Sequence, residues 1–258
     1  MLKAKSMVIA TVSAAILLSM ATASFARKKN HAKFTVRIEN ISSKDGIQAA
    51  DGTRYPFALS PGVFGAADGP VSFFIVGKRA PKGLEPQAED GDPGTLAEAI
   101  LDGAAIGEYG VFTNPVGSSK AAPILPGDAY EFTFDATEGA KLNLITMYGQ
   151  SNDLFYAPAS ALELFDKQGN SLSGDITDKF QLWDAGTEVN QAPGIGPDQA
   201  PRQAMKHQGA RENGVVHLVN DGFSYPNTKD VLRITIVSAE DNANTKKVGK
   251  KNETVSSM

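Results

Sequence analysis

The chain has 258 residues, of which 41% are hydrophobic and 21% are charged, and its formal net charge is −4. This composition is typical of a globular protein with a sizeable core, and the negative charge argues against nucleic acid as a partner. Cysteine is absent from the sequence, which excludes disulfide bonds and a thiol nucleophile.

The first 26 residues have the pattern of a secretion signal. Two lysines precede an apolar stretch at 8–20, and small residues that could be cleaved follow, up to Ala26. The apolar stretch is shorter than the roughly 20 residues of a spanning helix, so a cleaved signal is favoured over a retained anchor. We predict a signal peptide over residues 1–26, a secreted or periplasmic location, and no membrane span in the mature form.

Short strands are predicted along most of the remaining chain. Alternation of apolar and polar residues indicates a strand at 34–38, and a dense apolar run indicates a second strand. We expect strands, in chain order, at 34–38, 71–76, 130–134, 141–148, 215–219 and 231–237. Only 95–101 has a helical pattern, with Thr95 as its expected N-cap. These elements predict an all-β fold, an antiparallel β-sandwich with one short helix and long loops.

The strand pattern is weakest over residues 149–214, which are rich in turn-forming residues. Long loops in a compact domain are usually either functional or disordered. The chain becomes polar again after Val237, and two lysine pairs, Lys246-Lys247 and Lys250-Lys251, lie near its end. We predict one sandwich domain over 27–240 and a disordered polar and basic tail over 241–258, in preference to a docking motif at the end.

Enzyme motifs are not apparent. The segment Gly149-Gln-Ser-Asn-Asp153 lacks the final glycine of the serine hydrolase turn. The three histidines, at positions 31, 207 and 217, do not have the spacing of metal ligands, which argues against zinc chemistry. We therefore expect a protein that is not an enzyme.

Acidic residues in two loops suggest a hard cation instead. Asp153 follows Ser-Asn directly after a predicted strand, and Asp184 and Glu188 flank Ala-Gly-Thr. Calcium takes six to eight oxygen ligands, which loops of this composition can supply. A third acidic loop at 89–92 begins like an EF-hand, but Pro93 breaks that pattern. The spacing alone leaves open the alternative that these acids only form turns.

Seven segments, in the same order along the chain, resemble the spondin N-terminal domain family, which occurs in extracellular matrix proteins and small secreted bacterial proteins. Any one of the segments is a weak signal, whereas the collinear set is specific. The segments are Phe34-Thr-Val-Arg-Ile-Glu-Asn-Ile-Ser42, Leu59-Ser-Pro-Gly-Val-Phe64, Gly83-Leu-Glu85 with Ala88-Glu-Asp-Gly91, Pro123-Ile-Leu-Pro-Gly127, Thr146-Met147, Ser151-Asn-Asp-Leu-Phe155, and Trp183-Asp-Ala-Gly-Thr-Glu188 with Asn190.

This resemblance implies a C2-like β-sandwich whose end loops hold Ca²⁺, and a role in cell adhesion or matrix binding. It assigns the metal ligands to Asp153, Asp184 and Glu188, with a glutamate where animal members have aspartate. Trp183 would pack under the loop and fix its neighbour Asp184. The expected partner is an extracellular or envelope protein or glycan.

Two other functions stay open from the sequence. One is a carboxylate- or metal-assisted hydrolase of glycans, in which the same three acids would act as acid or base. The other is a structural subunit of the cell envelope for which a cation is incidental. Carboxylates that converge on one point would support the cation site, and carboxylates that flank an open cleft would support the hydrolase.

Overall fold

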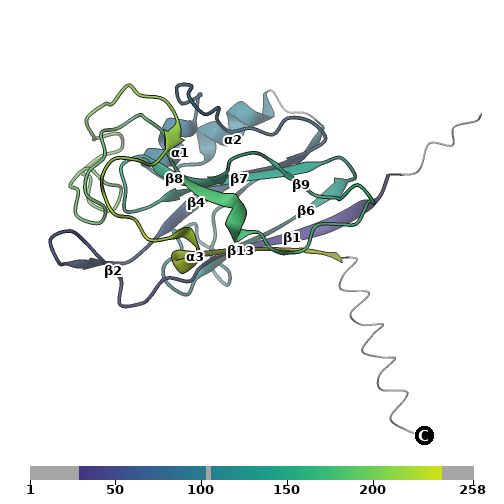
Figure 1. Ribbon diagram of the computed structural model, residues 1–258, viewed down its shortest axis with the longest axis horizontal. Helices are drawn as coiled ribbons and strands as arrows, with labels where there is room; N and C mark the ends of the chain where they lie inside the picture. The colour runs from purple at the N-terminus through teal and green to yellow at the C-terminus, as the bar shows by residue number, and fades with distance from the viewer. Residues whose placement is uncertain (1–28, 103–105, 240–258) are drawn as a thin grey trace, which may run out of the picture.

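The computed structural model describes residues 29–102 and 106–239, which form two facing β-sheets (Figure 1). The predicted signal peptide at 1–26 and the predicted tail at 241–258 lie outside the described residues. Within the described part, no helix combines the length and the apolar character that crossing a membrane requires.

The smaller sheet has four strands in the order β10, β13, β1, β6. Its central strand β1 is antiparallel to both β13 and β6, and its apolar residues at 34, 36 and 38 have no solvent exposure. Alternation along β1 therefore turns one face of this sheet toward the interior. The bounds are β1 (His31–Asn40), β6 (Ala129–Thr137), β10 (Gly174–Asp175) and β13 (Leu232–Ser238).

The larger sheet has seven strands, with the order β12, β11, β8, β7, β4, β5 and with β9 also paired to β7. A separate small hairpin joins β2 to β3. The bounds are β2 (Ile47–Gln48), β3 (Arg54–Tyr55), β4 (Leu59–Ala67), β5 (Gly107–Phe112), β7 (Lys141–Tyr148), β8 (Leu154–Pro158), β9 (Leu162–Glu163), β11 (Phe180–Asp184) and β12 (His217–Leu218).

Two hydrophobic cores hold the layers together. The main core lies between the sheets, where Phe64 of β4 stacks on Phe132 of β6 with ring centroids 4.2 Å apart. The second core lies on the outer face of the larger sheet, where Phe155 and Trp183 pack beneath the helices α1 (Leu84–Glu89) and α2 (Gly94–Leu101). Because the larger sheet is covered on both faces, the residues of β7 and β8 are almost continuously buried.

The all-β sandwich is confirmed, as are the predicted strands at β1, β6, β7 and β13. The expectation of a single helix is wrong, since α1 and a third helix, α3 (Thr228–Val231), also form, together with the 3₁₀ turn η1 (Thr177–Lys179). The predicted helix at 95–101 is present, but it begins at Gly94 after the N-cap Pro93, and no side chain caps it. The strand predicted at 215–219 is reduced to the two residues of β12.

The strand predicted at 71–76 is wrong. This segment is an irregular loop whose side chains at 71, 73 and 74 are buried in the second core, while Ile75 is 63% exposed. Asn143 on β7 donates a side-chain hydrogen bond to the carbonyl of Val71, 3.0 Å away. A dense apolar run is compatible with a covering loop as well as with a strand, because both bury their side chains.

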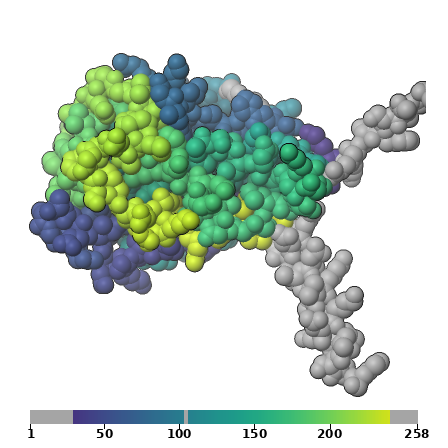
Figure 2. Space-filling model, viewed as in Figure 1, coloured from purple at the N-terminus to yellow at the C-terminus, as the bar shows by residue number. Residues whose placement is uncertain are grey.

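The long loops gather at one end of the sandwich. Figure 1 shows the segment that follows β11 beside α1 at this end, and the hairpin of β2 lies below it. In the space-filling view of Figure 2, late segments of the chain cover this end and meet the region of the helices. The predicted acidic loops therefore belong to a loop-built surface that the two sheets support.

Candidate metal centre

Two neighbouring strands bring the predicted acids Asp153 and Asp184 together. Asp153 ends the turn between β7 and β8, and Asp184 is the last residue of β11. Strands β8 and β11 are antiparallel, with Leu154 directly opposite Asp184. This register places the start of β8 beside the end of β11, so the two aspartates converge although they lie 31 positions apart in the sequence.

Asp153 has no solvent exposure, and its carboxylate is only half satisfied. Its Oδ2 accepts hydrogen bonds from the backbone N–H groups of Thr187, at 2.7 Å, and Glu188, at 3.0 Å, and from the Thr187 hydroxyl, at 3.1 Å. Its Oδ1 is buried and has no hydrogen-bond partner among the described residues. A buried carboxylate oxygen without a donor is costly, and one of the ways in which proteins satisfy such an oxygen is a bound cation.

Asp184 is 2% exposed and closes a tight turn. Its Oδ1 accepts the backbone N–H of Gly186, at 2.7 Å, and its Oδ2 accepts the side-chain amide of Asn190, at 2.6 Å. Gly186 has a φ of 67°, and a Cβ atom there would lie 2.6 Å from the backbone nitrogen of Val215. Glycine is therefore required in the Asp-Ala-Gly-Thr-Glu segment for two separate reasons, backbone conformation and close approach.

The third member of the cluster is Glu212, which the sequence analysis did not identify. One ligand atom from each of Asp153, Asp184 and Glu212 lies within 4.8 Å of the other two. Backbone hydrogen bonds from Glu212 to Thr187, at 3.0 Å, and from Gly214 to Gly186, at 2.7 Å, hold the segment in place. Glu212 is exposed, so the cluster has two buried acids and one acid facing solvent.

Glu188, the third predicted ligand, does not belong to this cluster. Its Oε2 accepts the side-chain amide of Asn152, at 3.2 Å, and its Oε1 accepts the backbone N–H of Gly209, at 2.9 Å. The backbone N–H of Glu188, rather than its carboxylate, contacts Asp153. The side chain thus braces the loop that follows, and the four-residue spacing from Asp184 does not bring the two carboxylates to one point.

Burial raises the pKa of each acid in the cluster, and the charge of Asp184 further raises the pKa of Asp153 and of Glu212. Desolvation, followed by the charge of Asp184, raises the pKa of Asp153 to about 8, against the opposing hydrogen bonds from Glu188 and Thr187. Desolvation also raises the pKa of Asp184 and, with the Asp184 charge, the pKa of Glu212. The imidazole of His217 lies beside this pair, with its Nε2 3.9 Å from Asp184 Oδ2, and it is charged only when protonated. A divalent cation would relieve this repulsion.

The ligand atoms on offer are those that calcium prefers. Three carboxylates contribute hard oxygens, and the side-chain carbonyl of Asn190 is a fourth candidate because its Oδ1 is buried without a partner in the described chain. Water could complete the six to eight ligands that calcium takes, on the side where Glu212 is exposed.

Trp183 has the structural role that the sequence suggested. It is 3% exposed, its indole N–H donates to the carbonyl of Ala157 at 3.0 Å, and its ring lies 5.1 Å from that of Phe74. These contacts anchor β11 immediately before Asp184. The tryptophan is therefore buried in the second core, where it cannot stack on a ligand at the surface.

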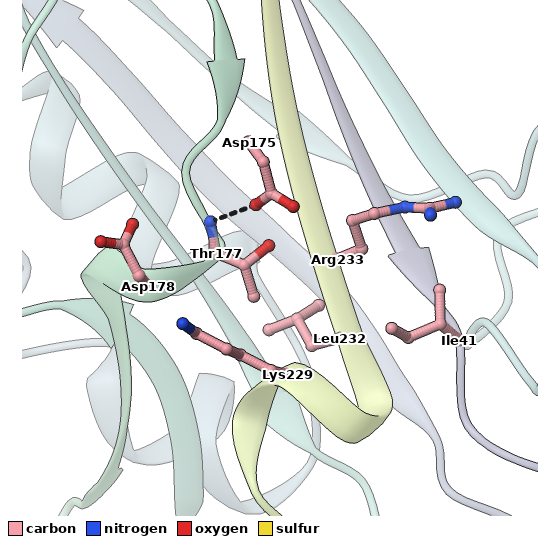
Figure 3. A pocket seen from close by; sticks show the side chains of 7 residues that line it. All are labelled: Ile41, Asp175, Thr177, Asp178, Lys229, Leu232 and Arg233. Carbon is pink, nitrogen blue, oxygen red and sulfur yellow. Dashed lines mark hydrogen bonds between the residues drawn. The ribbon is translucent and has the colours of Figure 1, made fainter.

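A hollow of about 280 Å³ near η1, α3 and β13 has a different character (Figure 3). Its four charged residues are all exposed, and in Figure 3 the guanidinium of Arg233 extends away from the side chains of Asp178 and Lys229. Arg233 instead pairs with Glu39, with its Nε 2.7 Å from Oε2. These groups do not converge, so the hollow is a weaker candidate site than the acidic cluster. The lining residues are Ile41, Asp175, Thr177, Asp178, Lys229, Leu232 and Arg233.

Comparison with known proteins adds no further evidence: no protein-family model matches the sequence, and no curated protein matches it. The resemblance to the spondin N-terminal domain family therefore stays a prediction from the seven segments.

Proposed function

We propose that this chain is an exported, non-catalytic β-sandwich module that binds Ca²⁺ through Asp153, Asp184 and Glu212, and that presents its end loops to an extracellular or envelope protein or glycan. The cation would order the loops 184–190 and 209–214, which meet at the cluster. Export rests on the signal pattern of residues 1–26, and the adhesive role rests on the resemblance to the spondin N-terminal domain family.

One observation carries the proposal. The carboxylate of Asp153 is fully buried beside that of Asp184, and one of its oxygens has no donor in the part of the chain that the structure describes. An aspartate that only forms a turn would be placed at the surface and would accept backbone N–H groups there, as the exposed Asp166 does from Gln168 and Asn170. The contrast favours a cation ligand over a turn-former.

The hydrolase alternative receives less support. A glycosidase needs two carboxylates about 5–9.5 Å apart across an open cleft. Here one carboxylate oxygen of each acid lies within 4.8 Å of the other two, and Asp153 has no exposed surface with which to contact a glycan. The burial of Asp153 therefore favours a cation ligand over a catalytic carboxylate.

The test is thermal unfolding of the protein lacking residues 1–26, in EDTA and in millimolar Ca²⁺. We expect calcium to raise the midpoint of the wild type and to leave that of Asp184→Asn unchanged, because a ligand of the folded state stabilises by mass action. Asp166→Asn serves as the control and should respond to calcium like the wild type. Equal midpoints of the wild type with and without calcium would overturn the proposal.

A further inference from the structure

A second cluster of potential ligands lies where the loop after β11 crosses helix α1. Glu85 and Glu89 are four residues apart on α1, which places them on one face of the helix. One ligand atom each of Glu85, Glu89 and His207 lies within 4.8 Å of the other two. The loop that supplies His207 continues to Glu212, so it reaches both clusters.

The imidazole of His207 is held between two buried carboxylates. Its Nδ1 is 2.5 Å from Glu89 Oε2, and its Nε2 is 3.4 Å from Asp90 Oδ2. The side chains of Glu89 and Asp90 are only 3% and 2% exposed, whereas that of His207 is 38% exposed. The Nδ1 atom thus faces the helix glutamates, and the opposite ring nitrogen faces Asp90.

Asp90 independently supports the role of His207 as a metal ligand. Its Oδ1 accepts the side-chain amide of Gln203, at 2.7 Å, while its Oδ2 is buried and makes no hydrogen bond within the described residues. A histidine that binds a metal through one nitrogen donates its other N–H to a carboxylate, which fixes the ring. If Nδ1 binds a metal, Nε2 must carry the proton, and the unpartnered oxygen of Asp90 is the acceptor in its path.

We propose that Glu85, Glu89 and His207 form a second metal site, selective for a borderline divalent transition-metal ion such as Zn²⁺, with Asp90 as the residue that orients the imidazole. An imidazole ligand favours Zn²⁺ over the hard Ca²⁺, which takes oxygen ligands. A tetrahedral metal in place of the proton shared by His207 and Glu89 would hold the two ligand atoms about 3.4 Å apart, so these side chains would have to separate by roughly 0.9 Å. The partial exposure of Glu85 and His207 provides the entry path.

The site would act as a cross-link. It joins helix α1 to the loop that also carries Gly209, which binds Glu188, and Glu212 of the first cluster. A chain without cysteine has no disulfide to fasten such a loop, and metal binding that requires the folded state adds stability directly. The neighbouring cations, Arg211 beside Glu85 at 3.3 Å and Lys206 beside Asp92 at 2.7 Å, are exposed and can yield to the metal.

The test is calorimetric titration of the protein lacking residues 1–26 with Zn²⁺ alone, in saturating Ca²⁺, at about pH 8 so that protons compete least with the metal. We expect one Zn²⁺ site in the wild type that His207→Gln abolishes and that Asp90→Asn weakens by about 10–100-fold. Far-UV circular dichroism checks that each variant is folded. Asp90→Asn provides a second route to the answer, because it keeps all three proposed ligands.

Two controls separate this site from the calcium cluster. His217→Gln removes the histidine near Asp184, and Asp184→Asn removes a proposed calcium ligand; both should bind Zn²⁺ like the wild type. A wild-type protein that binds Zn²⁺ but shows no response to Ca²⁺ would refute only the proposed function. Zn²⁺ binding that persists in His207→Gln, or that is lost in His217→Gln, would overturn the second site and leave His207 as an imidazolium paired with two carboxylates.

Discussion

Replacement of Asp153 by asparagine should stabilise the protein without metal and remove its response to calcium. The side chain keeps its size, so a carbonyl oxygen can still accept the hydrogen bonds from Thr187 and Glu188. The buried charge beside Asp184 disappears, and an amide N–H₂ takes the place of the oxygen that lacks a partner in the described chain. Most substitutions of buried, hydrogen-bonded residues destabilise, so the expected sign is unusual.

The magnitude follows from the pKa of Asp153. A rise from 3.8 to about 8 corresponds to a penalty on the order of 5 kcal/mol for the ionised, buried carboxylate. The hydrogen bonds to a neutral amide are weaker than those to a carboxylate, and this offsets about 1–3 kcal/mol of the stabilisation gained by removing the charge. We expect a net gain of about 2–4 kcal/mol in the free energy of unfolding at pH 8, which is roughly 4–16 °C in midpoint for a domain of this size.

Calcium should reduce the stability advantage of the variant over the wild type. A ligand at a hundredfold excess over its dissociation constant stabilises the folded wild type by about 2.7 kcal/mol, whereas the variant lacks a charged ligand and gains little. The assay is thermal unfolding by circular dichroism of both proteins, in EDTA and in millimolar Ca²⁺, with Asp166→Asn as the control for a surface aspartate. A variant that is less stable than the wild type by the same amount in both buffers would refute the reasoning.

Three further predictions test the surroundings of the cluster. Because the pKa values of Asp153 and Asp184 are raised, the folded state without metal binds protons more tightly than the unfolded chain. The free energy of unfolding in EDTA should therefore fall as the pH rises from about 4 toward 8, and its pH dependence should be weaker in calcium. A flat pH profile in EDTA would contradict this. Gly186→Ala should lower the free energy of unfolding, measured in urea, by at least about 1–3 kcal/mol, because the φ of 67° and the nearby Val215 nitrogen exclude a Cβ atom. An unchanged urea midpoint would show that the turn adapts. Trp183→Phe should cost about 1–3 kcal/mol through the lost indole hydrogen bond and packing, measured by urea unfolding with circular dichroism, and a neutral effect would argue against its anchoring role.

The local sequence pattern was sufficient to predict many strands of the sandwich. The alternation of Phe34, Val36 and Ile38 with polar residues predicts β1, because a strand buries every second side chain on one face. The apolar run at 71–76 failed as a predictor of a strand, since it covers the second core as a loop. Helix α1 was missed because it is only six residues long and owes its place to packing on the larger sheet.

The sequence alone determined the class of fold and predicted two aspartates that the structure brings into one acidic cluster, because strand periodicity and acidic turns are local properties of the chain. Tertiary structure decided the rest of the site. The pairing of β8 with β11 brings Asp153 to Asp184, and backbone bonds across the following loop bring in Glu212 while Glu188 turns to Asn152. His207 meets Glu89 across 118 residues of chain. Such contacts depend on where long loops cross, which is set by packing and hydrogen bonding between distant segments and leaves no periodic signal in the sequence.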